Sequence, residues 1–114
     1  MDERAYQHLA DDALKRIEDA LKDVDAEVVD CERAGDVLTL TFKSGVRCVV
    51  NTQRPTRQMW LAANARAWHF GWEESAKKWI DDKGQKSADG SPLDLFAAVA
   101  RIVRETAGIE LPLS

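Results

Sequence analysis

Carboxylates near the N-terminal end of the chain are the residues with the clearest capacity for chemistry. Six of them fall between positions 19 and 32: Asp19, Asp23, Asp25, Glu27, Asp30 and Glu32. Carboxylate oxygens are the ligands that hard metal ions prefer. The spacing matches no fixed motif such as an EF-hand loop, and no cluster of His or Cys accompanies it, so we predict shallow and weakly selective binding of a cation. The alternative is that these acids serve solubility and the protection of an edge strand by charge.

The charge of the chain is uneven along its length. Residues 1–36 carry twelve Asp or Glu against five Lys or Arg, whereas residues 37–114 carry eight against eleven, and the formal net charge is −4. Such an asymmetry indicates a partner of opposite charge. Nucleic acid is disfavoured as that partner, because the acidic third of the chain would repel its phosphates.

A second candidate site consists of one tryptophan, Trp60, among three amide side chains, those of Asn51, Gln53 and Gln58. An exposed Trp in polar surroundings is typical of a protein-binding hot spot. The alternative is that Trp60 is partly buried by a neighbour such as Trp68 or Trp79.

The side of the sheet on which Asn51 lies depends on one turn. A two-residue turn at Ser44–Gly45 pairs Leu40 with Val49, which places Asn51 on the same side as Leu40. A bulge or a different turn is needed to place Asn51 on the opposite side.

Alternation of apolar and polar residues marks the centre of a predicted sheet. Between Val37 and Phe42 the side chains of Leu38, Leu40 and Phe42 fall on one side, which is the period of a strand with one buried face. Five more strands are predicted from apolar and β-branched runs between turn signals. They are Val28–Glu32, Arg47–Asn51, Gln58–Ala62, Ala67–Trp72 and Lys77–Asp81.

Two helices are predicted at the ends of the chain. The first, Glu3–Val24, places apolar side chains on one stripe at 3.6-residue spacing: Tyr6, Leu9, Ala10, Ala13, Ile17, Ala20, Leu21 and Val24. The second is predicted to open with Ser91 as N-cap and Pro92 at the first position, and to stop at Gly108. Its predicted buried stripe comprises Leu93, Phe96, Ala97, Ala100 and Val103.

The order helix, six strands, helix predicts an α+β fold. We expect a two-layer sandwich in which the N- and C-terminal helices pack on one face of a roughly six-stranded antiparallel sheet, with the other face open. A chain of 114 residues with 45% hydrophobic residues supports one domain over residues 1–114. No apolar run approaches the roughly 18 residues of a membrane span, and the N-terminus lacks the apolar stretch of a signal peptide, so we expect a cytoplasmic protein.

Catalytic chemistry is not predicted. The two histidines lie far apart in sequence, no nucleophile stands beside a base, and no Gly-rich phosphate loop is present. Cys31 and Cys48 fit no metal spacing and fall on strands that should not be neighbours, so we expect free thiols in a reducing compartment.

Several segments resemble the frataxin family, specifically its bacterial CyaY branch. The specific part is the string Asn51-x-Gln53-x-Pro55-x-x-Gln58-x-Trp60-Leu61. Further matches follow in family order across nearly the whole chain: Leu9-Ala10-Asp11, Asp30-Cys31-Glu32, Val37–Phe42, His69-Phe70 and Trp79-Ile80. The family's fold is the helix-flanked antiparallel sandwich predicted above from the residues.

The resemblance implies weak surface binding of iron, Fe2+ or Fe3+, and association with a cysteine desulfurase and an iron–sulfur scaffold protein in iron–sulfur cluster assembly. It implies an acidic ridge that comprises Glu18, Asp19, Asp23, Asp25, Glu27, Asp30 and Glu32. It also implies a sheet surface for partner binding that comprises Asn51, Gln53, Gln58 and Trp60. We favour regulation of the desulfurase by docking, with iron as a modulator; the alternative is an iron donor or buffer. We expect a monomer, with iron-driven oligomers as the alternative.

The chain departs from the family pattern at a few positions. Lys22 stands where bacterial relatives often carry an acid, and Arg54 replaces a residue that is commonly acidic. The histidine often found near the start is displaced by one to His8, and the loops near Ser75 and Ser87 are longer than usual. These departures bear on how many iron ions the ridge holds.

Overall fold

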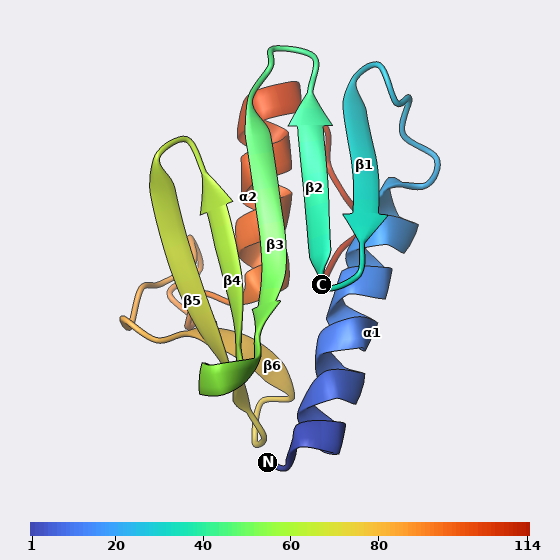
Figure 1. The fold of residues 1–114 in the computed structure, drawn as a ribbon. Coiled ribbons are helices and arrows are strands. Elements are labelled where there is room, and N and C mark those ends of the chain that lie inside the picture. Colours follow the sequence, from blue (N-terminus) through green and yellow to red (C-terminus); the bar gives the residue numbers. More distant parts are fainter.

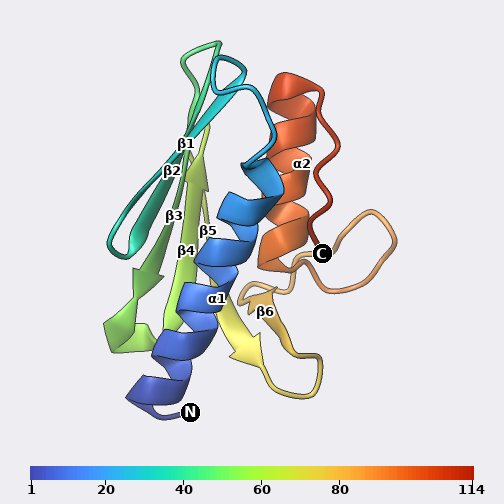
Figure 2. The same ribbon diagram turned by 90° about the vertical axis from the view of Figure 1, so that its right-hand side faces the viewer.

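A six-stranded antiparallel sheet forms one layer of the fold and two helices form the other, in the computed structural model of residues 1–114 (Figures 1 and 2). Both helices lie on the same face of the sheet. The predicted fold class and element order are confirmed. The elements are α1 (Glu3–Leu21), β1 (Val29–Ala34), β2 (Val37–Phe42), β3 (Arg47–Gln53), a short 3-10 helix (Arg54–Thr56), β4 (Gln58–Ala63), β5 (Arg66–Glu73), β6 (Lys78–Asp81) and α2 (Leu95–Ala107).

Each strand pairs with the strand before it, so the sheet order β1-β2-β3-β4-β5-β6 follows the chain. Strands β1 and β3 extend two residues beyond their predicted ends, because ladder pairing continues to Ala34 in β1 and to Gln53 in β3. Cys31 and Cys48 lie on either side of β2 and are free thiols, as predicted.

A three-residue turn that ends at Gly45 sets the register between β2 and β3. Gly45 has a φ of 92°, a left-handed conformation that glycine reaches at low cost and that three-residue hairpin loops commonly require. Leu40 therefore pairs with Cys48, one residue earlier than a two-residue turn would give. This difference places Asn51 on the open face, opposite Trp60 of β4.

The sheet face turned toward the helices carries the apolar core. Leu38, Leu40 and Phe42 of β2 and Ile17 of α1 are at most 3% exposed, and one cluster of 24 buried residues joins the two layers. The prediction that these four side chains are buried together is confirmed. Burial of each such side chain stabilises the fold by about 1.5–3 kcal/mol.

Helix α1 ends at Leu21, three residues before the predicted end at Val24. Asp25 explains the difference. Its side chain accepts a hydrogen bond from the backbone N–H of Glu27 at 2.9 Å, and its carbonyl accepts one from the N–H of Val28 at 2.9 Å. Local bonds of this kind offer the backbone an alternative to the helix.

Helix α2 begins at Leu95, so the predicted start at Ser91 is wrong. Pairing with β6 keeps the preceding residues extended, because the carbonyl of Leu93 accepts a hydrogen bond from the N–H of Asp81 at 2.9 Å. Asp94 provides the N-cap instead, and its side chain accepts from the N–H of the third helical residue at 2.7 Å. The predicted stop at Gly108 is confirmed.

The buried stripes of the helices also differ in part from the prediction. In α1, Leu14 is fully buried although the predicted stripe omitted it, and Ala20 is only partly buried. In α2, most of the predicted stripe is only partly buried, because pairing with β6 sets the rotation at which the helix starts. The buried residues of α2 are Leu95, Ala98, Val99, Ile102 and Val103.

The segment after α2 turns back along that helix (Figure 2). Its apolar side chains, Ile109, Leu111 and Leu113, pack against the core. Neither α1 nor α2 combines the length and the apolar character that a transmembrane helix needs.

Phe42→Ala is expected to lower the free energy of unfolding by about 3–5 kcal/mol, because it leaves a cavity between the layers. Denaturant-induced unfolding measures the change. Val37→Ala is the matched control, since Val37 lies on the same strand with 38% of its surface exposed; its effect should stay below about 1 kcal/mol. Equal stabilities of the two variants would contradict the placement of β2 in the core.

Candidate functional site

The acidic ridge occupies one edge of the molecule, where α1 ends and the outermost strand β1 begins (Figure 1). All of its members are exposed except Glu18, which is partly buried. The helix α1 carries Glu18 and Asp19, the connection to β1 carries Asp23, Asp25 and Glu27, and β1 carries Asp30 and Glu32.

Asp23 lies beyond the end of α1, whereas the predicted helix, which ran to Val24, would have placed it one turn after Asp19. Like charges one turn apart destabilise a continuous helix, and this pair escapes that penalty because α1 ends before Asp23. Asp19 remains in the last turn of α1, where the helix macrodipole disfavours an anion.

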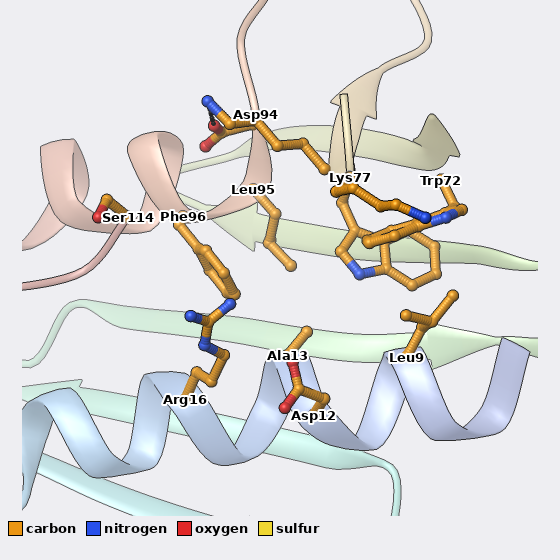
Figure 3. A pocket seen from close by; sticks show the side chains of 12 residues that line it. Leu9, Asp12, Ala13, Arg16, Trp72, Lys77, Asp94, Leu95, Phe96 and Ser114 are labelled. Carbon is orange, nitrogen blue, oxygen red and sulfur yellow. Dashed lines mark ion pairs between the residues drawn. The ribbon is translucent and has the colours of Figure 1, made fainter. Parts of the chain in front are cut away.

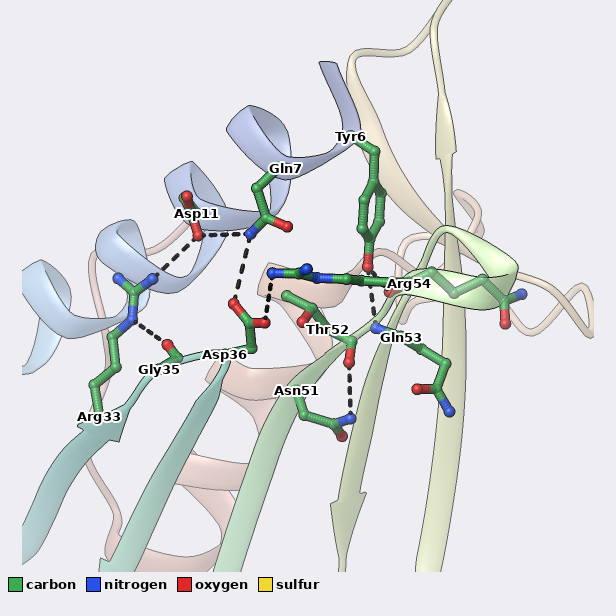
Figure 4. Close-up of polar contacts among 11 residues, drawn as sticks. Tyr6, Gln7, Asp11, Arg33, Gly35, Asp36, Asn51, Thr52, Gln53 and Arg54 are labelled. Carbon is green, nitrogen blue, oxygen red and sulfur yellow. Dashed lines mark hydrogen bonds and ion pairs between the residues drawn. The ribbon is translucent and has the colours of Figure 1, made fainter. Parts of the chain in front are cut away.

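Arg33 neutralises part of the acidic charge. It reaches from β1 on the helix side of the sheet, with Nη1 3.3 Å from Oε1 of Glu18 and Nη2 3.3 Å from Oδ1 of Asp11. Figure 4 shows the contact with Asp11. All ridge members other than Glu18 are free of ion pairs. The ridge therefore keeps most of its negative charge for a partner or a cation.

The ridge carboxylates do not converge on one point. No group of three or more His, Cys, Asp or Glu side chains anywhere in the chain is placed to hold one metal ion. A cation on this surface would meet one or two carboxylates and keep water in the rest of its coordination shell. The arrangement can attract cations but cannot enclose them.

Cys31 lies beside the ridge and responds to its charge. Burial raises the pKa of the Cys31 thiol to about 11, and the negative charges of Glu18 and Asp30 add to the rise. Burial alone raises the pKa of the Cys48 thiol to about 12. Both thiols are protonated at neutral pH, so neither is a ready thiolate nucleophile.

The sheet surface lies on the open face, on the adjacent strands β3 and β4. Asn51 pairs with Trp60 and Gln53 pairs with Gln58 across these strands. The structure thus brings together all four side chains that the sequence singled out.

Trp60 is partly buried, and its neighbour is His69 rather than Trp68 or Trp79. The indole and imidazole rings stack with centroids 4.2 Å apart and an interplanar angle of 17°. Trp68 and Trp79 belong to the buried core. Sequence reasoning did not select His69 as a site residue; the register of β4 and β5, which pairs it with Trp60, is what places it there.

Hydrogen bonds fix the orientation of the Trp60 indole. Its Nε1 donates to Oε1 of Gln58 at 3.0 Å, and Nε2 of Gln58 donates to Oδ2 of Asp82 at 3.1 Å. The same Asp82 oxygen lies 3.8 Å from Nδ1 of His69. Asp82 is a second residue that the sequence did not reveal. An aromatic side chain held in this way loses little conformational freedom on binding a partner.

Tyr6 fastens the sheet surface to the helix layer. Its hydroxyl accepts from the N–H of Gln53 at 3.0 Å (Figure 4). It donates to the carbonyl of Gln58 at 2.8 Å. Burial is the main cause that raises the pKa of the Tyr6 hydroxyl above its usual value. One side chain of α1 thus holds both ends of the turn that joins β3 to β4.

A polar network beside this turn neutralises Arg54, whose Nη2 lies 3.2 Å from Oδ2 of Asp36 (Figure 4). Nε2 of Gln7 lies within 3.5 Å of Oδ1 of Asp36 and within 3.1 Å of Oδ1 of Asp11. Arg54 stands where the family pattern commonly has an acid, and this pairing keeps it from presenting a free positive charge.

A cleft of about 120 Å3 lies between the two helices and the β5–β6 hairpin (Figure 3). Leu9, Ala13 and Leu95 line it, and the guanidinium of Arg16 covers the ring of Phe96 at 5.5 Å. Small-molecule sites typically have volumes of about 300–1,000 Å3. The cleft contains none of the predicted site residues and is too small to be a candidate site.

Known proteins share this sequence pattern and this fold. Residues 1–91 match the family model described as a frataxin-like domain. The iron-sulfur cluster assembly protein CyaY of Pseudomonas fluorescens (strain Pf0-1) is 32% identical over 110 residues, which cover 96% of this chain and 93% of that protein.

Two solved structures are similar in fold. Frataxin from Psychromonas ingrahamii has a TM-score of 0.81 at 24% identity, covering 97% of this chain and 96% of that one. Trimeric frataxin from the yeast Saccharomyces cerevisiae, complexed with ferrous iron, has a TM-score of 0.71 at 22% identity, covering 89% and 87%.

Tyr6→Phe is expected to lower the free energy of unfolding by about 1–3 kcal/mol, because it leaves the Gln53 N–H and the Gln58 carbonyl without their partner. Hydrogen exchange followed by NMR should show faster exchange of the Gln53 amide. Thr56→Val is the control, because it removes an exposed hydroxyl that bonds the Gln53 carbonyl at 3.3 Å. Unchanged protection of the Gln53 amide in Tyr6→Phe would contradict the anchoring role.

Proposed function

The chain belongs to the frataxin-like family, and on this premise we propose that it is a non-enzymatic protein of iron–sulfur cluster assembly. In this proposal it docks on the cysteine desulfurase and its scaffold protein and regulates them, with iron as a modulator. The observation that carries the proposal is the largely unpaired acidic ridge beside an open sheet surface with an oriented Trp60. The name of the related Pseudomonas fluorescens protein, an iron-sulfur cluster assembly protein, supports the role.

The acidic ridge and the sheet surface partly share the open face. Asp30 pairs with Thr41 and Glu32 pairs with Thr39, and these positions alternate with the core-facing residues of β1 and β2. A partner that covers the sheet surface would therefore also meet ridge carboxylates on β1. A basic patch on that partner would be steered toward the acids, and Trp60 would supply the anchor.

Iron binding in this proposal is weak and confined to the surface. The unpaired carboxylates of the ridge suit hard and borderline cations, but they select poorly among them. The yeast frataxin structure complexed with ferrous iron supports iron as the cation.

An iron donor that delivers iron to the scaffold is the second candidate function. The open arrangement of carboxylates favours it, because iron held by one or two of them can leave readily. Both candidates need the same negative surface. They differ in whether docking alone changes desulfurase activity.

We further propose that the protein is a cytoplasmic monomer. Two free cysteine thiols suit a reducing compartment. The yeast frataxin structure is trimeric, so iron-driven oligomers remain the alternative state to test by sedimentation.

Replacing Asp19 and Asp23 together by Asn is expected to weaken iron binding severalfold. The free energy of unfolding should stay unchanged or rise by about 0.3–1 kcal/mol, because the change removes an anion from the C-terminal turn of α1. Anaerobic calorimetric titration with ferrous iron measures the first effect and denaturant unfolding the second.

Trp60→Ala should leave iron binding unchanged, because an indole offers no ligand, while it weakens docking by more than about 1 kcal/mol.

The matched control for iron binding in the Asp19/Asp23 variant replaces Glu73 and Glu110 by Gln, which changes the net charge equally outside the ridge. Equal loss of iron binding in the Glu73/Glu110 variant would show that overall charge, and not the ridge, binds iron.

The on-rate for docking on the desulfurase is expected to fall as ionic strength rises toward physiological values, because steering is electrostatic. Reversing the charges at Asp19, Asp23 and Glu27 should remove most of that dependence. Surface plasmon resonance over a salt series measures the on-rate. Desulfurase turnover with and without an iron chelator then separates the two candidate functions.

Regulation by docking requires that the charge-reversed variant loses its effect on turnover whether iron is present or not. Delivery of iron requires that chelation abolishes the effect of the unaltered protein while docking stays intact. The second outcome would overturn the proposed regulatory function.

A further inference from the structure

A cavity of about 300 Å3 lies between the β4–β5 hairpin, the loop after β6 and α2. Three cationic side chains line it, those of Arg66, Lys86 and Arg101, against one carboxylate, that of Glu105. This local excess of positive charge occurs in a chain whose net charge is −4. The acidic ridge lies along the end of α1 and the edge strand β1, and three strands separate β1 from β5 in the sheet (Figure 1).

The cations of this cavity retain free donors. Arg66 and Lys86 form no ion pair, and the Arg66 guanidinium is held over the ring of Trp68 at 4.7 Å from the ring centroid. Nε of Arg101 donates to Oε1 of Glu105 at 2.8 Å, which leaves the other guanidinium N–H groups free. The Arg101 hydrogen bond, together with the charges of Arg101, Arg104 and Arg66, lowers the pKa of Glu105, so the one carboxylate is ionised and already paired.

The loop that carries Lys86 is held in place from within the fold. Asp81 is 5% exposed, and its Oδ2 accepts from the N–H groups of Lys83 at 3.1 Å and Gln85 at 3.0 Å. The carbonyl of Gln85 in turn accepts from the N–H of Leu93 at 2.9 Å. These bonds place Lys86 opposite α2 before any ligand arrives, and such preorganisation lowers the cost of binding.

The remaining lining adds an apolar wall and neutral donors. Trp68, Leu93 and Ile102, each at most 8% exposed, form an apolar floor, and the side chains of Asn64 and Gln85 supply amide N–H groups. An Arg fork and a Lys ammonium are the donors that bind phosphate and carboxylate groups. The volume lies at the lower end of the range for small-molecule sites, about 300–1,000 Å3.

The geometry points to a binding site for a small organic anion that presents a phosphate or carboxylate group to Arg66, Lys86 and Arg101, above a floor formed by Trp68 and Ile102. This site is separate from the acidic ridge and the sheet surface. It needs neither iron nor a protein partner. Phosphate and carboxylate share the chemistry that the site recognises, and the probes below distinguish them.

The test titrates isotope-labelled, metal-free protein separately with inorganic phosphate, glycerol 3-phosphate and citrate, and follows backbone, Trp indole and Arg side-chain NMR signals. Sodium chloride at equal ionic strength is the blank. We expect saturating shifts at Trp68, Arg66 and Lys86 and in the last turns of α2. Arg66→Gln and Lys86→Gln should each raise the dissociation constant by about tenfold or more, because each removes a charge-assisted contact.

Lys22→Gln is the matched control, because it removes one exposed positive charge at the end of α1, outside the cavity. The dissociation constant of each anion from this variant should differ from that of the unaltered protein by less than about twofold, because salt screens distant charges. Thermal unfolding checks that all variants are folded; Arg66 and Lys86 are exposed, so both replacements should be tolerated. Saturation by the phosphates alone or by citrate alone assigns the anion class. Shifts that never saturate, that spread over distant lysines, or that persist in both cavity variants would overturn the site.

Discussion

The register between β2 and β3 is the constraint on which both faces of the sheet depend. Successive side chains of a strand point to opposite faces, so a slip of one residue would exchange core and open positions along β3. The left-handed conformation of Gly45 permits the three-residue turn that prevents this slip. Cys48 and Val50 therefore fill the core while Asn51 and Gln53 face outward, and β4 follows with Trp60 on the outer side.

Stability and the proposed recognition of a partner are divided between the two faces of the same strands. The helix side holds the buried cluster, whereas the open side carries amides, threonines and one stacked aromatic pair. Tyr6 connects the two faces. It is buried in the helix layer, and its hydroxyl bonds Gln53 and Gln58 at the two ends of the turn between β3 and β4. Acids on the edge strand β1 also discourage pairing with a strand of another chain. Edge protection is thus compatible with the partner recognition proposed for Asp30 and Glu32.

The charge of the molecule is separated in space as well as in sequence. The acidic ridge lies at the junction of α1 and β1, and Arg33 neutralises only Glu18 within it. Two cations without an ion pair, Arg66 and Lys86, lie instead at the cavity between the β4–β5 hairpin, the loop after β6 and α2. A molecule polarised in this way is oriented by the field of a charged partner before contact. The loosely arranged carboxylates suit steering and transient cation binding better than permanent chelation, which requires converging ligands.

Local periodicity determined the order of the elements, the α+β class and the apolar faces that hold Phe42 and its neighbours, because alternation and helical spacing are properties of short segments. The sequence also singled out the carboxylates of the ridge and, through the family resemblance, the four residues of the sheet surface, but the turn at Gly45 decided that Asn51 lies on the same face as Trp60. Tertiary structure decided where α2 begins, because Leu93 pairs with β6 before the helix starts. It also decided that His69 stacks on Trp60 and that Arg33 meets Glu18. Contacts of this kind depend on strand register and on how elements distant in sequence pack together. The spacing of residues along one segment determines neither the register nor this packing.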